Sequence, residues 1–173
     1  MDLTEDELAG VVDLFGGLTR AELSEALAEL VYRQGGEYDL SAHADTIDAA
    51  IRSYHLVAVA NPADREATER DWADEKAHSG KPLLLAGPLA FPTLPSDARD
   101  LPHILDVSKR TVDTDDVGHE VAEMFREDAR SAIDADDQSR IDTLLDASYE
   151  VEPWTGVDLA PVRQDLAAAT QTN

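Results

Sequence analysis

Residues 3–31, LTEDELAGVVDLFGGLTRAELSEALAELV, contain the same helix-start signal twice. In each copy a threonine, Thr4 or Thr19, stands three residues before a glutamate and directly after a leucine. Threonine and glutamate at this spacing form a capping box, in which each side chain bonds the backbone N–H of the other residue. The repeated signal therefore predicts two consecutive helices.

Apolar residues recur at helical spacing after each signal, which predicts one buried face on each helix. Glycine pairs, Gly16-Gly17 and Gly35-Gly36, follow these faces and predict the helix ends. No third copy of the signal follows, so we do not predict a helical repeat protein. The predicted core positions are Leu8, Val11, Val12 and Phe15 in the first helix and Leu23, Ala26, Leu27, Leu30 and Val31 in the second.

A third helix and two short strands are predicted next. The helix begins near Ser41 and carries Ile47, Ala50, Ile51 and Tyr54 on one face. The strands, Leu56-Val57-Ala58-Val59 and Leu83-Leu84-Leu85-Ala86, are short apolar runs that form a predicted hairpin. Three helices followed by a hairpin is the element order of a winged helix.

The chain after the hairpin changes character. Four prolines, Pro88, Pro92, Pro95 and Pro102, predict an extended segment without regular helix from Gly87 to Pro102. Further helices follow: one is capped by Asp115 or Asp116, one starts after the turn at residues 134–137, and one starts at Pro161.

The predicted fold class is mainly α with a small β-hairpin: a winged-helix-like N-terminal region followed by a C-terminal helical layer. Residues 1–88 form the winged-helix-like region, and residues 61–81 within it form an exposed insert that is either a helix or mobile. Residues 89–114 form the extended proline-rich segment, and residues 115–169 form the helical C-terminal region.

Acidic residues dominate the composition. The 173 residues include 37 Asp and Glu against 14 Lys and Arg, a formal net charge of −23, while 43% of residues are hydrophobic. Asp outnumbers Glu, and lysine is limited to Lys76, Lys81 and Lys109. Such charge destabilises a compact chain at ordinary ionic strength, whereas ~1 M salt shortens the Debye length to about 3 Å. The composition therefore indicates a folded protein of a salt-rich cytoplasm and a halophilic archaeon as its source.

Cysteine is absent, which excludes disulfides and thiolate chemistry. No stretch reaches the ~20 apolar residues of a membrane span, and the first residues, MDLTEDEL, are acidic where a signal peptide would be basic. We therefore expect a cytoplasmic protein with no membrane association.

Three stretches of the chain carry a family resemblance: VVDLFGGLTRAELSEALAEL (11–30), GPLAFPTLPSDARDLPHILDV (87–107) and ASYEVEPWTGVDLAPVR (147–163). They are similar to an uncharacterised family of haloarchaeal proteins, a domain of unknown function. The resemblance covers most of the chain except residues 61–81, and it implies no activity, catalytic residue or cofactor.

The sequence encodes no recognisable catalytic or metal site. Residues 113–118, DTDDVG, begin like a calcium-binding loop, but Met124 stands where a bidentate glutamate is needed. His119-Glu120 begins like a zincin motif, but Glu123 stands in place of the second histidine. We therefore predict no cofactor and no catalytic residue, and a hydrolase or metal-dependent enzyme is the least favoured function.

A DNA-binding winged-helix regulator is the alternative function. Its basic residues would be Arg52 of the third helix and, in the connection between the strands, Arg65, Arg70, Lys76 and Lys81. Acidic residues surround all of them, so the local charge stays negative and nucleic acid is not the favoured partner.

A non-catalytic protein-interaction or regulatory role is the favoured function, with an unidentified protein partner. The proline-punctuated segment contains Phe91, Leu94 and Ile104, and the two tryptophans, Trp72 and Trp154, stand among polar residues. Large apolar side chains in such surroundings can anchor a partner. These five residues are the predicted binding positions, and the competing interpretation is that they pack against the core.

Overall fold

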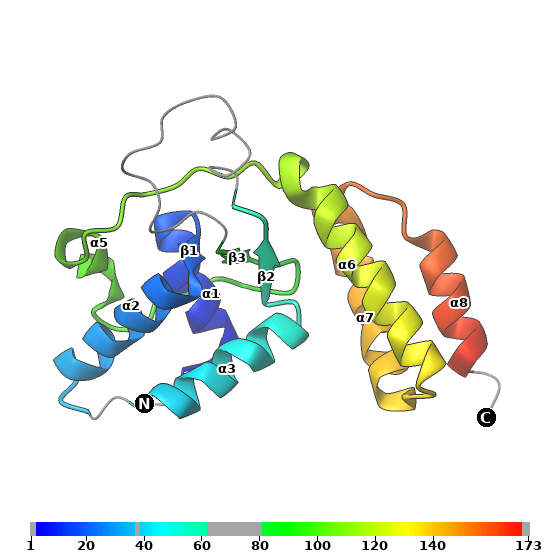
Figure 1. The fold of residues 1–173 in the computed structure, drawn as a ribbon, viewed down its shortest axis with the longest axis horizontal. Helices are drawn as coiled ribbons and strands as arrows, with labels where there is room; N and C mark the ends of the chain where they lie inside the picture. The colour runs from blue at the N-terminus through cyan, green and yellow to red at the C-terminus, as the bar shows by residue number, and fades with distance from the viewer. Residues whose placement is uncertain (1–2, 37–38, 62–80, 171–173) are drawn as a thin grey trace. The chain divides into compact units, whose positions relative to one another are not determined.

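The computed structural model describes residues 3–36, 39–61 and 81–170. The chain is mainly helical with a small antiparallel sheet (Figure 1), which confirms the predicted fold class. It divides into two compact units, Met1–Val112 and Asp113–Asn173.

Both predicted capping boxes are present in unit 1. Helix α1 (Glu5–Phe15) starts after Thr4, and helix α2 (Arg20–Arg33) starts after Thr19. The backbone N–H of Thr19 donates to Glu22 Oε2 at 2.7 Å, and the N–H of Glu22 donates to Thr19 Oγ1 at 3.3 Å. Gly16 ends α1 in the left-handed conformation, with φ of 71°, as the glycine pair predicted.

Helix α3 (Leu40–Arg52) starts one residue before Ser41, because the Asp39 side chain accepts hydrogen bonds from the first turn. The prediction that Tyr54 lies on the helix is wrong. Tyr54 follows the end of α3 with φ of 60°, where the chain reverses toward the sheet. Its side chain is nevertheless buried, which explains why its apolar spacing resembled a helical position.

The two predicted strands have the expected bounds, β2 (Leu56–Val59) and β3 (Leu83–Ala86). Strands β2 and β3 pair antiparallel, as the predicted hairpin requires, and a third strand that was not predicted, β1 (Leu18–Thr19), pairs antiparallel with the other edge of β3. The sheet order is β1-β3-β2. Strand β1 was not predicted because two residues are too few to show an alternating pattern, and because Leu18 and Thr19 also belong to the helix-start signal of α2.

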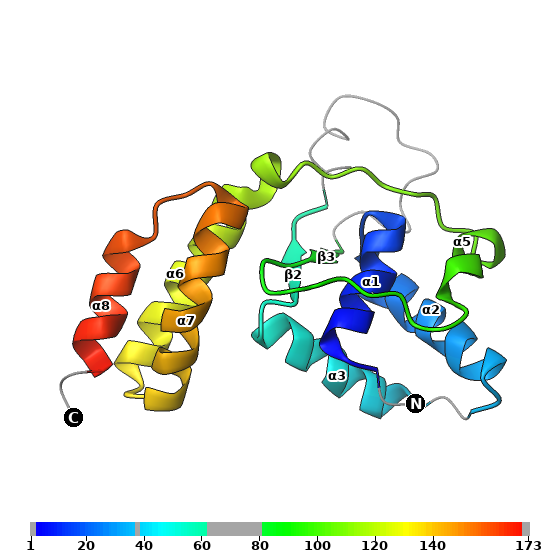
Figure 2. The ribbon, with the colours of Figure 1, turned by 180° about the vertical axis from the view of Figure 1, so that it is seen from behind.

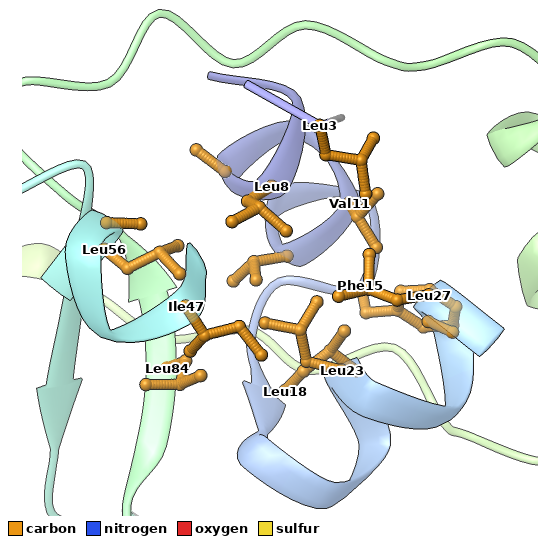
Figure 3. Packing of buried hydrophobic residues seen from close by; sticks show 14 of the residues in the cluster. Leu3, Leu8, Val11, Phe15, Leu18, Leu23, Leu27, Ile47, Leu56 and Leu84 are labelled. Atoms are coloured by element: carbon orange, nitrogen blue, oxygen red, sulfur yellow. The ribbon is translucent and has the colours of Figure 1, made fainter. Parts of the chain in front are cut away.

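The core of unit 1 lies where α1, α2, α3 and the sheet converge (Figure 3). Leu8 and Phe15 of α1, Leu27 of α2, Ile47 of α3 and Leu56 of β2 are almost fully buried there. The core positions predicted for the first two helices are all buried.

The chain after β3 runs across α1 to a 3-10 turn, η1 (Ala98–Asp100), and a short helix, α5 (Leu101–Ile104) (Figure 2). The prediction that Gly87 to Pro102 excludes helix is therefore wrong at its end. Pro102 lies in the first turn of α5, where the missing proline N–H has no helical partner to lose.

Unit 2 consists of α6 (Thr114–Asp134), α7 (Gln138–Thr155) and α8 (Ala160–Thr170). The cap of α6 is Asp113, which accepts from the N–H of Asp115 at 3.0 Å, so the predicted cap at Asp115 or Asp116 is wrong. Those two acids lie in the first turn instead, near the positive end of the helix dipole. The last helix starts one residue before the predicted Pro161.

Candidate functional site

The predicted anchors of the proline-punctuated segment point outward. Phe91 is 79% exposed, Leu94 41% and Ile104 40%. We call residues 87–112, which follow β3, the connecting segment. Of the other two predicted anchors, Trp154 is half-buried on α7 of unit 2, and Trp72 lies outside the described residues. The structure therefore places three of the five side chains on one segment of unit 1.

Hydrogen bonds to α1 hold the first half of the connecting segment. The N–H of Phe91 donates to Asp6 Oδ1 at 2.8 Å, and the N–H of Thr93 donates to the Asp6 carbonyl at 3.1 Å. A Cβ added to Gly10 would lie 2.0 Å from the Thr93 carbonyl oxygen. The glycine thus allows backbone contact with α1, and this contact positions Phe91.

The inner face of the connecting segment covers the core. Pro95, Ala98 and Leu101 are buried, and Leu105 and Val107 pack against the apolar cluster of unit 1. The segment therefore covers the core with one face and exposes bulky apolar side chains on the other. An exposed face on a segment anchored in this way has little conformational freedom left to lose on binding.

Arg110 binds the C-terminal end of the connecting segment to the start of α2 and the end of α1. Its N–H donates to the Phe15 carbonyl at 2.7 Å, and its guanidinium donates to the Gly17 carbonyl at 2.9 Å. The same guanidinium binds both carboxylate oxygens of Glu22, at 2.8 and 3.0 Å. A Cβ at Gly16 would lie 1.9 Å from the Arg110 carbonyl oxygen, so this position also requires glycine.

The carboxylate of Glu22 connects the hydrogen bonds of Arg110 to the cap of α2. It accepts from Thr19 as well as from Arg110. Burial by itself raises the pKa of the Glu22 carboxyl, but the hydrogen bonds from Arg110 and Thr19 outweigh burial and hold the pKa below its usual value. The ionised form is therefore the one that the fold stabilises.

A histidine lies beside the other anchor of the connecting segment. His55 Nδ1 lies 3.1 Å from Glu5 Oε2, and its Nε2 lies 3.8 Å from Asp6 Oδ1, the oxygen that receives Phe91. The Gly87 N–H donates to the His55 carbonyl at 2.8 Å. These contacts join the end of α3 to α1 at the point where the connecting segment begins.

The predicted DNA contacts are only partly within the described residues. Arg52 is exposed at the end of α3, and Lys81 is exposed just before β3, whereas Arg65, Arg70 and Lys76 lie outside the described residues. Asp45 is also exposed on α3. The described surface of this helix therefore offers one arginine together with an acid.

A groove of about 600 Å³ opens between α2, α3 and the sheet, all within unit 1. It is mostly apolar, with a serine hydroxyl and two cationic side chains among its lining residues. The lining residues are Arg20, Ala21, Ser24, Ala44, Ile51, Ala58, Lys81, Pro82 and Leu84. No local sequence pattern marks the groove, because these residues come from several distant segments. Lys81 is the only predicted site residue among them.

A polar network closes the turn between α7 and α8 in unit 2. Glu152 Oε2 accepts from the N–H of Leu159 and from Arg163 Nη2, both at 2.8 Å. The hydrogen bond from Leu159, followed by that from Arg163, lowers the pKa of the Glu152 carboxyl. The Arg163 guanidinium also lies 5.0 Å from the centre of the Tyr149 ring. These contacts connect the two helices.

The acidic clusters of the sequence serve as helix caps. Asp113 caps α6, and Asp137 caps α7 by accepting from the N–H of Arg140 at 3.1 Å. Within the part of the chain that the structure describes, no three His, Asp or Glu side chains are grouped so that they could hold a metal ion. Across the same residues, no helix is both long and apolar enough to span a bilayer.

A sequence profile described as a family of unknown function, DUF7109, matches residues 6–171. The match includes the connecting segment and the helices of unit 2, and it confirms the expected similarity to a family without an assigned function. No curated protein and no solved structure matches the chain.

Proposed function

The chain belongs to DUF7109, a family of unknown function, and we propose from its own surface that it is a non-catalytic protein that binds another protein through its connecting segment. The observation that supports this most strongly is the exposure of Phe91, Leu94 and Ile104 on a segment fastened at both ends. A regulatory or scaffolding role would need such a surface and no reacting groups.

The energetics favour this surface as an anchor. Full burial of a Phe or Leu side chain contributes about 1.5–3 kcal/mol, and a few such side chains dominate most interfaces. Because the hydrogen bonds to Asp6 already fix the backbone at Phe91 and Thr93, a partner would not have to order it. In a salt-rich cytoplasm, apolar contacts also keep their strength while charge pairs are screened.

The test compares two exposed aromatic residues. Phe91→Ala removes the most exposed anchor of the connecting segment, and Tyr149→Ala removes a ring that is 62% exposed in unit 2. Each variant and the wild type would be used to capture proteins from cell extract in molar KCl, with quantitative mass spectrometry. We expect a partner whose recovery falls at least tenfold with Phe91→Ala and stays unchanged with Tyr149→Ala. Identical recoveries with all three proteins would contradict the proposal.

A second function, DNA binding, is favoured by the arrangement of unit 1. Its order α1-β1-α2-α3-β2-β3, with sheet order β1-β3-β2, resembles that of winged-helix domains. In such a domain α3 would be the recognition helix, with Arg52 near its end. We rank this function second because Asp45 and Asp48 also lie on that helix and oppose phosphate binding.

Fluorescence anisotropy with labelled duplex DNA separates the two functions. If the protein is an interaction module, we expect no saturable binding between ~0.5 and ~2 M KCl, because the described α3 surface cannot neutralise a track of phosphates. Saturable binding that is lost in Arg52→Ala or Arg65→Ala, with the helix content intact by circular dichroism, would reverse the ranking.

The proposed setting is a haloarchaeal cytoplasm. The support is compositional: 37 acidic against 14 basic residues, more Asp than Glu, and three lysines. A surface of this kind remains compact when concentrated salt screens its charges.

A further inference from the structure

We propose that the groove between α2, α3 and the sheet binds a small organic anion with an apolar body, such as an aromatic carboxylate or sulfonate. This inference goes beyond the proposed function, because the groove shares no residue with the connecting segment. The lining residues that the structure describes all belong to unit 1.

The size and lining of the groove suit an apolar body. Its volume of about 600 Å³ lies within the ~300–1,000 Å³ typical of small-molecule sites. Ile51 of α3, Ala58 of β2 and Leu84 of β3 contribute hydrocarbon surface from three different elements. Small side chains, Ala21 and Ala44, leave the space open. A planar or branched apolar group would therefore find contacts on several sides.

The charge of the lining favours an anion. Arg20 and Lys81 are its charged residues, and no carboxylate is among the described lining residues, although acids outnumber bases by 37 to 14 in the chain. Lys81 is exposed where it lines the groove, and no ion pair joins it to another described residue, whereas Arg20 is paired with Asp48. In a chain of net charge −23, two cationic side chains lining one groove favour an anionic ligand over a neutral one.

Arg20 is already oriented by its neighbours. Its Nη2 lies 2.7 Å from Asp48 Oδ1 and donates to the Ala44 carbonyl at 3.2 Å. Both contacts use the same nitrogen, so the donors on Nε and Nη1 are not used by these bonds. A guanidinium held in this way can bind a carboxylate or sulfonate without first losing side-chain freedom.

The start of α2 adds to the same preference. Arg20 and Ala21 are the first two residues of this 14-residue helix, and both line the groove. The first backbone N–H groups of a helix lack intrahelical acceptors and carry the positive end of its dipole. The lysine, the arginine and the helix start thus all favour a negative group at this side of the groove.

The test uses two fluorescent probes with the same aromatic body. Anilinonaphthalene sulfonate carries an anionic group, and phenylnaphthylamine lacks it; both brighten in an apolar site. Each would be titrated into the full chain at the lowest KCl concentration that preserves its helix content. We expect one saturable sulfonate site per chain, with at least tenfold weaker binding of the neutral probe.

Matched variants locate the site. Lys81→Glu should weaken sulfonate binding at least tenfold, whereas Lys109→Glu makes the same charge change at an exposed lysine outside the groove and should leave binding unchanged. Ala44→Leu should fill the groove and weaken both probes. Circular dichroism of each variant confirms that the fold is retained.

Three results would overturn the inference. The first is an absence of saturable sulfonate binding to the wild type. The second is an equal effect of the two lysine variants, which would show only a general charge effect. The third is loss of the site in Phe91→Ala, which would assign the probe to the connecting segment instead.

Discussion

Thr4 and Thr19 form equivalent capping boxes in different surroundings. Thr4 is exposed near the start of the chain, whereas Thr19 is 1% exposed, and its hydroxyl donates to the Glu22 carboxylate at 2.9 Å. The second box is therefore joined through Glu22 to Arg110, and no described arginine joins the first box in this way. The two capping boxes should thus contribute different amounts to the free energy of unfolding.

We expect Thr19→Ala to lower the free energy of unfolding by about 1–2 kcal/mol, at the upper end of the range for N-cap substitutions. Thr4→Ala should cost less, because an exposed helix end near a terminus can fray. Chemical denaturation of both variants at one fixed KCl concentration measures the difference. Equal losses would show that the burial of Thr19 adds nothing to its cap.

The ionised Glu22 side chain should make unfolding depend on pH. Its pKa in the folded state is held below the usual value, so its stabilisation is fully present above the ordinary glutamate pKa. That stabilisation is lost as the pH falls through the lower, folded-state pKa. Glu22→Gln should therefore be less stable than the wild type near neutral pH, and the difference should shrink toward acid pH.

Denaturation curves between about pH 3 and 7 test this expectation. Glu25→Gln is the control, because Glu25 is an exposed glutamate of the same helix. A difference between wild type and Glu22→Gln that stays constant over the whole range would mean that the carboxylate charge does not contribute.

At the scale of secondary-structure elements, two glycines set how closely segments approach. Gly10 of α1 faces the Thr93 backbone, and Gly118 of α6 faces the Thr155 carbonyl oxygen, which would lie 2.4 Å from an added Cβ. Both glycines lie inside helices, where glycine is unfavourable by roughly 1 kcal/mol relative to alanine. Their presence is explained by close packing and not by helix propensity.

Gly10→Ala and Gly118→Ala should therefore destabilise the protein despite the better helix propensity of alanine. Ser131→Ala on the exposed face of α6 is the control and should be neutral or slightly stabilising. Thermal melting at fixed KCl distinguishes these outcomes. A rise in melting temperature for Gly10→Ala would show that the connecting segment moves away from α1 without cost.

The element boundaries show where local sequence is sufficient. The starts of α1 and α2 and the bounds of β2 and β3 were predictable, because caps and short apolar runs act over a few residues. Strand β1 was not predictable, because it forms only by pairing with β3. The helix at Pro102 was not predictable either, because its first turn begins before the proline.

At the scale of the whole molecule, net charge should control stability. Circular dichroism should show cooperative melting of helix in about 2 M KCl and a marked fall in melting temperature at about 0.1 M, where the Debye length grows to roughly 10 Å. At low salt the carboxylates of a chain with a net charge of −23 repel one another, and this repulsion destabilises the folded state. A melting temperature that does not change with KCl would remove the argument for a salt-rich cytoplasm.

The candidate surfaces show how far sequence could lead at this scale. The proline-rich context predicts Phe91, Leu94 and Ile104 as anchors, but the same context also favours the competing interpretation, in which the segment covers the core. Which face of an extended segment points outward depends on what lies beneath it, here Gly10 and the Asp6 hydrogen bonds. The groove left no local signal at all, because its lining is assembled from residues far apart in the chain.

The fold class, the capping boxes, the strands β2 and β3 and the excess of acidic charge are predictable from the sequence, because each depends on composition or on residues a few positions apart. The third strand, the outward face of the connecting segment and the groove lined by Arg20 and Lys81 become visible only in the folded chain. These features depend on contacts between distant residues. Side chains such as Glu22 and Arg110, 88 positions apart, meet only after the helices and the sheet have packed into a common core.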